Sequence, residues 1–144
     1  MTDPNHIISI ISSVRTHAAD YLETELAAAG AEGLIASHGS ILGILFRNGG
    51  KLRMKEIAEK INRDKSTVTH HIHSLIRLGY VKKEKSGDDG RETFVVLTAK
   101  GLKLEEPVKS ISRKLLSRAY RNFTEEEKQS LVALLEKMRA NFED

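Results

Sequence analysis

The chain has no cysteine, and this absence excludes several classes of protein. Without a thiol, its 144 residues can form no disulfide framework, cysteine zinc site, iron–sulfur cluster or thiol redox sensor. Tryptophan is also absent, there are 2 prolines, and aromatic residues make up only 5%. So little proline, beside many Ala, Leu, Glu and Lys residues, favours a mainly helical protein.

Long apolar runs are missing as well. No stretch approaches the roughly 18 apolar residues that a membrane-spanning helix needs, so we expect no contact with a membrane. The N-terminal segment has an acidic start and an apolar run broken by Ser9, Ser12 and Ser13, which is not expected of a signal peptide. The length suits a single domain, residues 1–144, with a core of its own. We therefore expect a soluble, cytoplasmic protein.

The net charge is only +3, but it is unevenly distributed. Residues 47–92 contain 12 Lys and Arg against 7 Asp and Glu, whereas the rest of the chain contains 11 against 13. A basic middle segment is typical of a surface that binds a polyanion, although a solvated lysine-rich face would give the same count.

Periodicity and capping signals predict the order of the elements. Apolar residues at three- and four-residue spacing predict helices at about 6–29 and 34–46, and a Thr124–Glu127 capping box opens a last helix that runs to about 141. Thr98 is expected to start another long helix, with a kink or restart near Pro107. Between these lie a short extended segment at 51–54 and a helix at 54–61.

The middle of the chain then predicts a helix-turn-helix followed by a β-hairpin. Asp64 is a suitable N-cap for a helix from Lys65, and Gly79 a suitable residue just past its end. The stretches "YVKKEKS" and "RETFVVLT" predict two strands around a "GDDG" turn. The fold class is therefore mainly α with a small β-hairpin wing. The winged helix-turn-helix core is expected at about 34–99, flanked by helices at about 5–30 and 100–142.

The helix that starts at Lys65 has two different faces. Val68, Ile72, Leu75 and Ile76 form an apolar stripe that must face a core. The opposite face contains hydroxyls, imidazoles and a guanidinium, and no carboxylate follows Asp64 within this helix. Such a face can lie against phosphates and base edges in a major groove. The candidate DNA-binding residues of this helix are Lys65, Ser66, Thr67, Thr69, His70, His73 and Arg77.

Basic residues outside this helix extend the predicted interface. Arg53, Lys55 and Arg63 are candidates for contacts with the DNA backbone. At the tip of the hairpin, Arg91 could enter a minor groove, held in place by Asp89. A routine polar turn is the alternative for the "DDG" sequence.

The three clustered histidines allow two other interpretations. His70 and His73 share one face at a spacing that could hold zinc, but the sequence offers no cysteine and no carboxylate there as further ligands, so we predict no metal and no cofactor. No carboxylate is placed to orient an imidazole for catalysis, so we predict that the chain is not an enzyme. Hydrogen bonds from His70 and His73 to DNA are favoured, with His71 beside the core. A histidine contact would make DNA binding depend on pH.

The stretch from Leu52 to Gly101 resembles the MarR family of winged-helix transcription factors. The resemblance is carried by "DKSTVT", "LIRLGYV", Asp89-x-Arg91 and "VLTAKG" in family order and spacing. Two positions depart from the family pattern. Arg53 stands where many members have a capping Thr, and His70 stands where Arg is common.

The resemblance implies a transcription regulator that binds a pseudo-palindromic operator in double-stranded DNA as a homodimer, and that acts as a ligand-responsive repressor. Its partners would be DNA, a second copy of the chain, and a small effector such as an aromatic or phenolic anion. His17, Tyr21 and His38 are candidates for lining the effector cleft. A metal-responsive sensor, or an interaction module that does not bind DNA, remains the alternative.

Overall fold

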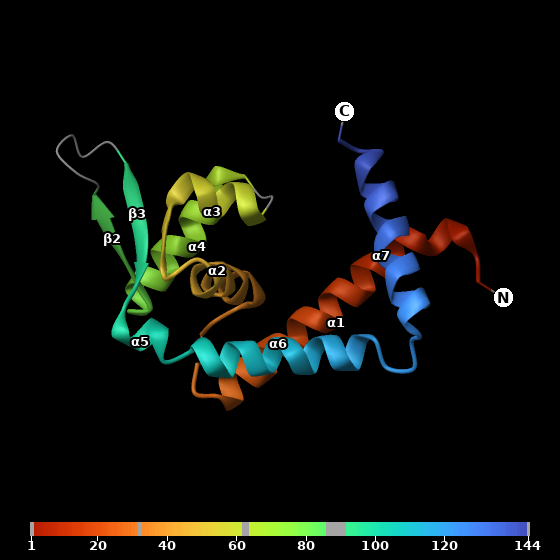
Figure 1. The fold of residues 1–144 in the computed structure, drawn as a ribbon, viewed down its shortest axis with the longest axis horizontal. Coiled ribbons are helices and arrows are strands. Elements are labelled where there is room, and N and C mark those ends of the chain that lie inside the picture. Colours follow the sequence, from red (N-terminus) through yellow and green to blue (C-terminus); the bar gives the residue numbers. More distant parts are fainter. Residues whose placement is uncertain (1, 32, 62–63, 86–91, 144) are drawn as a thin grey trace. The chain divides into compact units, whose positions relative to one another are not determined.

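The computed structural model describes residues 2–31, 33–61, 64–85 and 92–143 of the chain. It divides into two compact units, Met1–Ser112 and Arg113–Asp144. The first unit contains the helix-turn-helix and the sheet, and the second contains the end of the last-but-one helix and the last helix (Figure 1). No helix among the described residues is both long and apolar enough to cross a membrane.

The first unit begins with helical segments η1 (Pro4–His6) and α1 (Ile7–Ala28), followed by α2 (Ala36–Arg47). Strand β1 (Lys51–Arg53) leads into α3 (Met54–Ile61), and α4 (Lys65–Arg77) follows. The strands β2 (Val81–Lys85) and β3 (Thr93–Leu97) come next, and then the short helix α5 (Ala99–Leu102). The predicted order of elements is confirmed through this unit.

The three strands form one antiparallel sheet in the order β1-β3-β2. Leu52 of β1 pairs with Val95 of β3, and Lys83 of β2 pairs with the same Val95 from the other side. The predicted hairpin is therefore present in its strands, while its "GDDG" turn lies outside the described residues. The wing gains a third strand from the segment before α3.

The core of the first unit lies where α2, α3 and α4 meet the sheet. Because α4 packs on α2, α3 and β2, its apolar stripe is enclosed, and Val68, Ile72 and Leu75 are at most 2% exposed. Ile76 is only partly buried. The largest side chains that are fully buried in this core are Ile41, Leu42, Leu45, Ile57, Ile72, Leu75, Val81 and Val95.

The "LTAKG" segment fastens the end of α4 to the sheet. The hydroxyl of Thr98 donates to the carbonyl of Gly79 at 2.6 Å and accepts the N–H of Gly101 at 3.1 Å, so one side chain caps α5 and joins it to the turn after α4. Lys100 donates to the carbonyl of Leu78 at 2.7 Å, where the last carbonyls of α4 lack helical partners. Gly79 itself has φ +85°, a conformation that glycine adopts without strain.

The predicted restart near Pro107 is confirmed, and it divides the stretch from Thr98 into two helices. The chain ends α5 at Leu102 and begins α6 (Glu105–Ala119) at Glu105. Pro107 therefore lies in the first turn of α6, where a backbone N–H has no helical acceptor and its loss costs little.

The second unit contains the end of α6 and the helix α7 (Glu125–Ala140). The predicted capping box is confirmed, because Thr124 accepts the N–H of Glu127 at 3.1 Å and the Glu127 carboxylate accepts the N–H of Thr124 at 2.9 Å. Asn122, with φ +67°, makes the turn between the two helices. Within the unit, apolar side chains of α7 stay exposed, among them Leu131, Val132, Leu134 and Leu135.

Candidate nucleic-acid interface

The outward side of α4 is polar and open to solvent. Ser66, His70, His73 and Arg77 are exposed on it, opposite the buried stripe of Val68, Ile72 and Leu75. Because the opposite side of α4 packs on α2, α3 and β2, its whole outward face is available to enter a groove of DNA. Lys65 is likewise exposed, and Thr67 and Thr69 are half-buried at its border.

Asp64 organises the first turn of α4. Its carboxylate accepts hydrogen bonds from the Ser66 hydroxyl at 2.7 Å, the Thr67 N–H at 2.8 Å and the Thr67 hydroxyl at 2.8 Å. These three bonds, with that from Ser66 the largest cause, lower the pKa of Asp64 from 3.8 to about 2. The two hydroxyl protons are thus directed at Asp64, and each hydroxyl oxygen keeps its acceptor positions for an outside donor.

The remaining hydroxyls of α4 bond to its own backbone. Thr69 donates to the carbonyl of Lys65 at 2.7 Å, and Ser74 donates to that of His70 at 3.3 Å. Arg77 in turn donates to the Ser74 hydroxyl at 3.0 Å and stays exposed. Thr69 is therefore fixed in one rotamer, whereas the exposed guanidinium of Arg77 retains donors for a phosphate.

His73 contacts the wing. Its Nε2 lies 2.9 Å from the Nζ of Lys83 on β2. Because an ammonium group only donates, the imidazole nitrogen is the acceptor in this bond. This contact joins the predicted DNA-binding face of α4 to the adjacent strand, and nothing in the spacing of the sequence had indicated it.

The predicted backbone contacts differ in their surroundings. Lys55 is exposed on α3, as its predicted role requires, and Arg63 lies outside the described residues. Arg53 is half-buried and forms ion pairs with two glutamates. Its Nε lies 3.1 Å from the carboxylate of Glu92 and 3.8 Å from that of Glu56, and neither contact has hydrogen-bond geometry. The Arg53 N–H also donates to Glu56, so this glutamate supplies a cap where the family has Thr. A phosphate would have to replace two carboxylates at Arg53.

The wing-tip pair, Asp89 and Arg91, lies outside the described residues. Both remain predictions from the sequence. The strands that lead to the tip, β2 and β3, are described, and β2 packs on α4.

Three imidazoles lie in a row from the core to the surface. The ring of buried His38 on α2 stands edge-on to His71 at 5.4 Å, and His71 lies 5.5 Å from His70, which is exposed. The Nδ1 of His38 accepts the N–H of Ile35 at 3.1 Å, while its Nε2 is buried without a partner in the described part of the chain. Burial, and then the charges of His71 and His70, lower the pKa of His38 from 6.5 to about 4.

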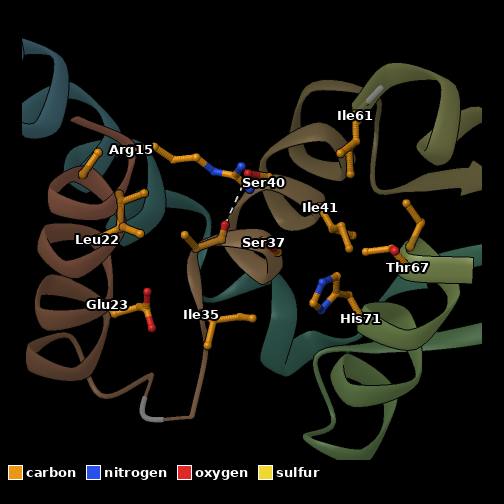
Figure 2. A pocket seen from close by; sticks show the side chains of 14 residues that line it. Arg15, Leu22, Glu23, Ile35, Ser37, Ser40, Ile41, Ile61, Thr67 and His71 are labelled. Carbon is orange, nitrogen blue, oxygen red and sulfur yellow. Dashed lines mark hydrogen bonds between the residues drawn. The ribbon is translucent and has the colours of Figure 1, made fainter. Parts of the chain in front are cut away.

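A cavity of about 400 Å³ opens between α1 and the helix-turn-helix (Figure 2). Arg15, Leu22 and Glu23 line it from α1, and Thr67 and His71 line it from the inner side of α4. Ala18 and Ala19 are small enough to leave room between the helices. The other lining side chains come from α2 and its approach, from α3 and from α4: Ile35, Ala36, Ser37, Ser40, Ile41, Ile61 and Val68.

The predicted effector residues lie near this cavity but do not line it. His38 reaches it only through its ring contact with His71. The Nδ1 of exposed His17 lies 2.8 Å from the carbonyl oxygen of Ser13, and Tyr21 is half-buried on α1. The spacing of Arg15, Ala18, Ala19 and Leu22 on one helix face could have indicated the α1 wall, whereas the α4 wall depends on packing. The effector role of His17, Tyr21 and His38 stays a prediction.

Metal binding finds no support in the described ranges. No group of three or more His, Asp or Glu side chains there is arranged to hold an ion. His71 turns toward the cavity and His73 toward β2, so the clustered histidines are directed to different places.

The fold and this face define a winged helix-turn-helix DNA-binding protein. The sequence model described as "Winged helix DNA-binding domain" matches residues 34–101. The chain is 34% identical to the HTH-type transcriptional regulator YwoH of Bacillus subtilis over 71% of this chain and 73% of that one. It is 32% identical to the HTH-type transcriptional repressor IacR of Pseudomonas putida over 72% and 61% of the two chains.

Several solved structures of transcriptional regulators have the same fold as this chain. A MarR protein from Peptoclostridium difficile is 26% identical, with a TM-score of 0.82 and coverage of 99% of this chain and 90% of that one. A MarR mutant from E. coli complexed with operator DNA (21% identical, TM-score 0.77, coverage 95% and 99%) shares the fold. The organohalide-sensing regulator RdhR-CbdbA1625, bound to 2,4-dichlorophenol, does so too (21%, TM-score 0.84, coverage 98% and 82%).

The chain belongs to the MarR family of winged-helix transcriptional regulators. This is a family of DNA-binding regulators and not one of enzymes. The match spans 66% of the length of YdgJ of Bacillus subtilis and 61% of that of IacR, less than two thirds of each protein.

Proposed function

We propose that this regulator is a homodimeric, ligand-responsive repressor that binds a pseudo-palindromic operator through α4. The observation that carries the proposal is the exposed face of Ser66, His70, His73 and Arg77, which no carboxylate of α4 interrupts. A major groove about 12 Å wide admits a helix with such a face. The operator complex of the E. coli relative supports this mode of binding for the fold.

Phosphate contacts and base contacts are assigned to different residues. Exposed Lys55, Lys65 and Arg77 supply charge toward phosphates, which would set affinity and its salt dependence. Arg53, Arg63 and the wing pair Asp89 and Arg91 are proposed on the sequence. Base readout is assigned to five side chains of α4: Ser66, Thr67, Thr69, His70 and His73.

A second copy of the chain is the proposed partner. Ile8, Ile10, Ile11 and Val14 on α1 are at least 36% exposed within the first unit, in a helix that is otherwise well formed. In the second unit, α7 and the segments beside it expose apolar side chains of their own. Clusters of this kind mark association surfaces. A two-fold dimer would bury them and present two copies of α4 to half-sites one helical turn apart, roughly 34–36 Å.

The cavity is the proposed effector site. Its walls are mostly aliphatic, and Arg15 and Glu23 line it from α1. An aromatic or phenolic anion would therefore bind with its charge on the Arg15 side of the cavity. Thr67 and His71 line it from α4, the helix that is proposed to bind DNA, so a bound molecule would press directly on that helix. The dichlorophenol-bound relative and the repressor IacR support ligand response and repression for this chain. A regulator of this class acts where the chromosome lies, which supports a cytoplasmic location.

Selection of bound sequences from a pool of random duplexes tests the proposal. Enrichment of a palindrome with half-sites one turn apart is expected, and a phenolic anion such as salicylate should release the selected duplex. An Arg15→Met variant should need more of the anion for release while binding the duplex as before. Failure to enrich any sequence at low salt would contradict operator binding, and release unchanged in the variant would contradict the effector site.

A further inference from the structure

Lys83 on strand β2 of the wing contacts His73 on α4. Their nitrogens, Nζ and Nε2, are 2.9 Å apart, and both side chains are exposed. On β2, successive side chains point to opposite faces of the sheet, so Lys83 shares a face with buried Val81 and is directed at α4. Lys82 points to the other face, where it pairs with Glu84 at 3.6 Å.

This contact decides which nitrogen of His73 bears the proton. An ammonium group has three donors and no acceptor, so the Nε2 of His73 must accept. A neutral imidazole carries one N–H, and with Nε2 accepting, that N–H is on Nδ1. The wing thereby makes Nδ1 a hydrogen-bond donor.

We propose that Lys83 is a specificity-determining positioning residue, which holds His73 in the Nδ1–H tautomer so that this nitrogen donates to an acceptor on a base edge. In the major groove the acceptors are N7 and O6 of guanine, N7 of adenine and O4 of thymine. Cytosine presents only an amino donor there, so the base facing His73 is predicted to be other than cytosine. The inference rests on the proposed DNA-binding face of α4 but adds a residue from outside that helix.

The tautomer can be measured without DNA. Ring ¹⁵N chemical shifts of His73 at pH 8, assigned by comparison with His73→Gln, distinguish Nδ1–H from Nε2–H. The Nδ1–H form should dominate in the wild type. In Lys83→Met, the populations should move toward Nε2–H, the form that a free imidazole prefers in water. Lys83→Arg, which keeps a donor, should restore the wild-type pattern.

Base preference provides the second measurement. With Lys83→Met, selection from random duplexes should lose its discrimination at one position in each half-site by roughly 3- to 10-fold, as expected for one hydrogen bond. Lys82→Met is the matched control, because it removes the same charge from the adjacent residue on the opposite face. It should leave that base preference unchanged.

Two results would overturn the inference. One is a His73 tautomer that is the same in wild type and Lys83→Met. The other is a selected sequence that is identical in Lys83→Met and Lys82→Met, with affinity lowered alike for all duplexes, which would make Lys83 only a phosphate contact. If the wild type enriches no sequence while the tautomer responds as predicted, the proposed operator binding fails and the positioning role of Lys83 stands.

Discussion

At the scale of one residue, the burial of His38 should make the stability of the folded protein sensitive to acid. Its ring is 5% exposed, and its Nδ1 accepts the N–H that starts α2. Its pKa in the folded protein is about 4, against 6.5 for an ordinary histidine. The unfolded chain therefore takes up a proton first as the pH falls. The stability that the neutral ring supports is complete above pH 6.5 and is lost as the pH falls from 6.5 toward 4.

A His38→Asn variant tests this dependence, because Asn keeps an acceptor near the position of Nδ1. Between pH 7 and pH 5, His38 should account for about 2 kcal/mol of lost unfolding free energy in the wild type, following 1.36 kcal/mol for each pH unit below 6.5. Urea denaturation at both pH values should show a shallower decline in the variant, whatever its stability at pH 7. Parallel declines in the two proteins would show that His38 does not titrate as described.

Gly101 shows, at the scale of the element, why the segment after β3 needs a residue without a side chain. A Cβ added there would lie 2.1 Å from the carbonyl oxygen of Tyr80 and 3.1 Å from a methyl group of Leu97. The oxygen belongs to the backbone and cannot rotate away. The close approach lets Thr98 join α5 to the turn that ends α4.

Gly101→Ala should therefore destabilise the first unit by about 3 kcal/mol or more, at the upper end of overpacking costs. Gly39→Ala is the matched control: it lies in α2, where an added Cβ meets nothing nearer than 4.0 Å, and a helical Ala is favoured over Gly. Thermal unfolding should show a large fall in Tm for the first variant and none for the second. A Gly101→Ala protein as stable as the wild type would mean that α5 can move away from Tyr80 at no cost.

Helix ends that are set by residues close together in the chain could be predicted from the sequence. Asp64, Gly79 and Thr124 each occupy the predicted capping position, because a cap depends on chain neighbours. The break between α5 and α6 was only partly foreseen, since it depends on how α5 is held by Thr98 as well as on Pro107. The exposed face of α4 followed from its periodicity.

Contacts between distant segments could not be read in the same way. Lys83 is ten residues from His73, and only the packing of β2 on α4 brings them together. Likewise, the walls of the cavity come from α1, α2, α3 and α4. The sequence therefore did not single out Arg15, Ser40 and His71 as lining residues, whereas the family resemblance had suggested His17 and Tyr21. Residue type indicates what a side chain can do, whereas tertiary structure determines what it faces.

Dimerisation belongs to the scale of the whole molecule. Leu134 on α7 is 62% exposed. The helix itself is stabilised by its N-terminal capping box and by an ion pair between Glu136 and Arg139. A Leu134→Asp substitution should convert a dimer into a monomer at micromolar concentration, because a charge would have to be buried against apolar side chains. Light scattering on a sizing column measures this directly.

Gln129→Asp is the control for that experiment, since it adds the same charge to a polar position of α7 and should leave the dimer intact. Loss of the dimer should also weaken binding to a two-half-site duplex far more than binding to a single half-site. A wild-type protein that is monomeric at these concentrations would contradict the proposed assembly.

The most direct test of the account is the base preference of His70→Ala measured on the selected operator. His70 is exposed at the centre of the proposed reading face, and His6→Ala, at the exposed N-terminal end of α1, is the control. The account predicts that His70→Ala relaxes one base position in each half-site, costing about 1–2 kcal/mol there, while the salt dependence stays the same. Affinity that falls equally for every duplex, or that does not change at all, would contradict the claim that α4 reads the operator.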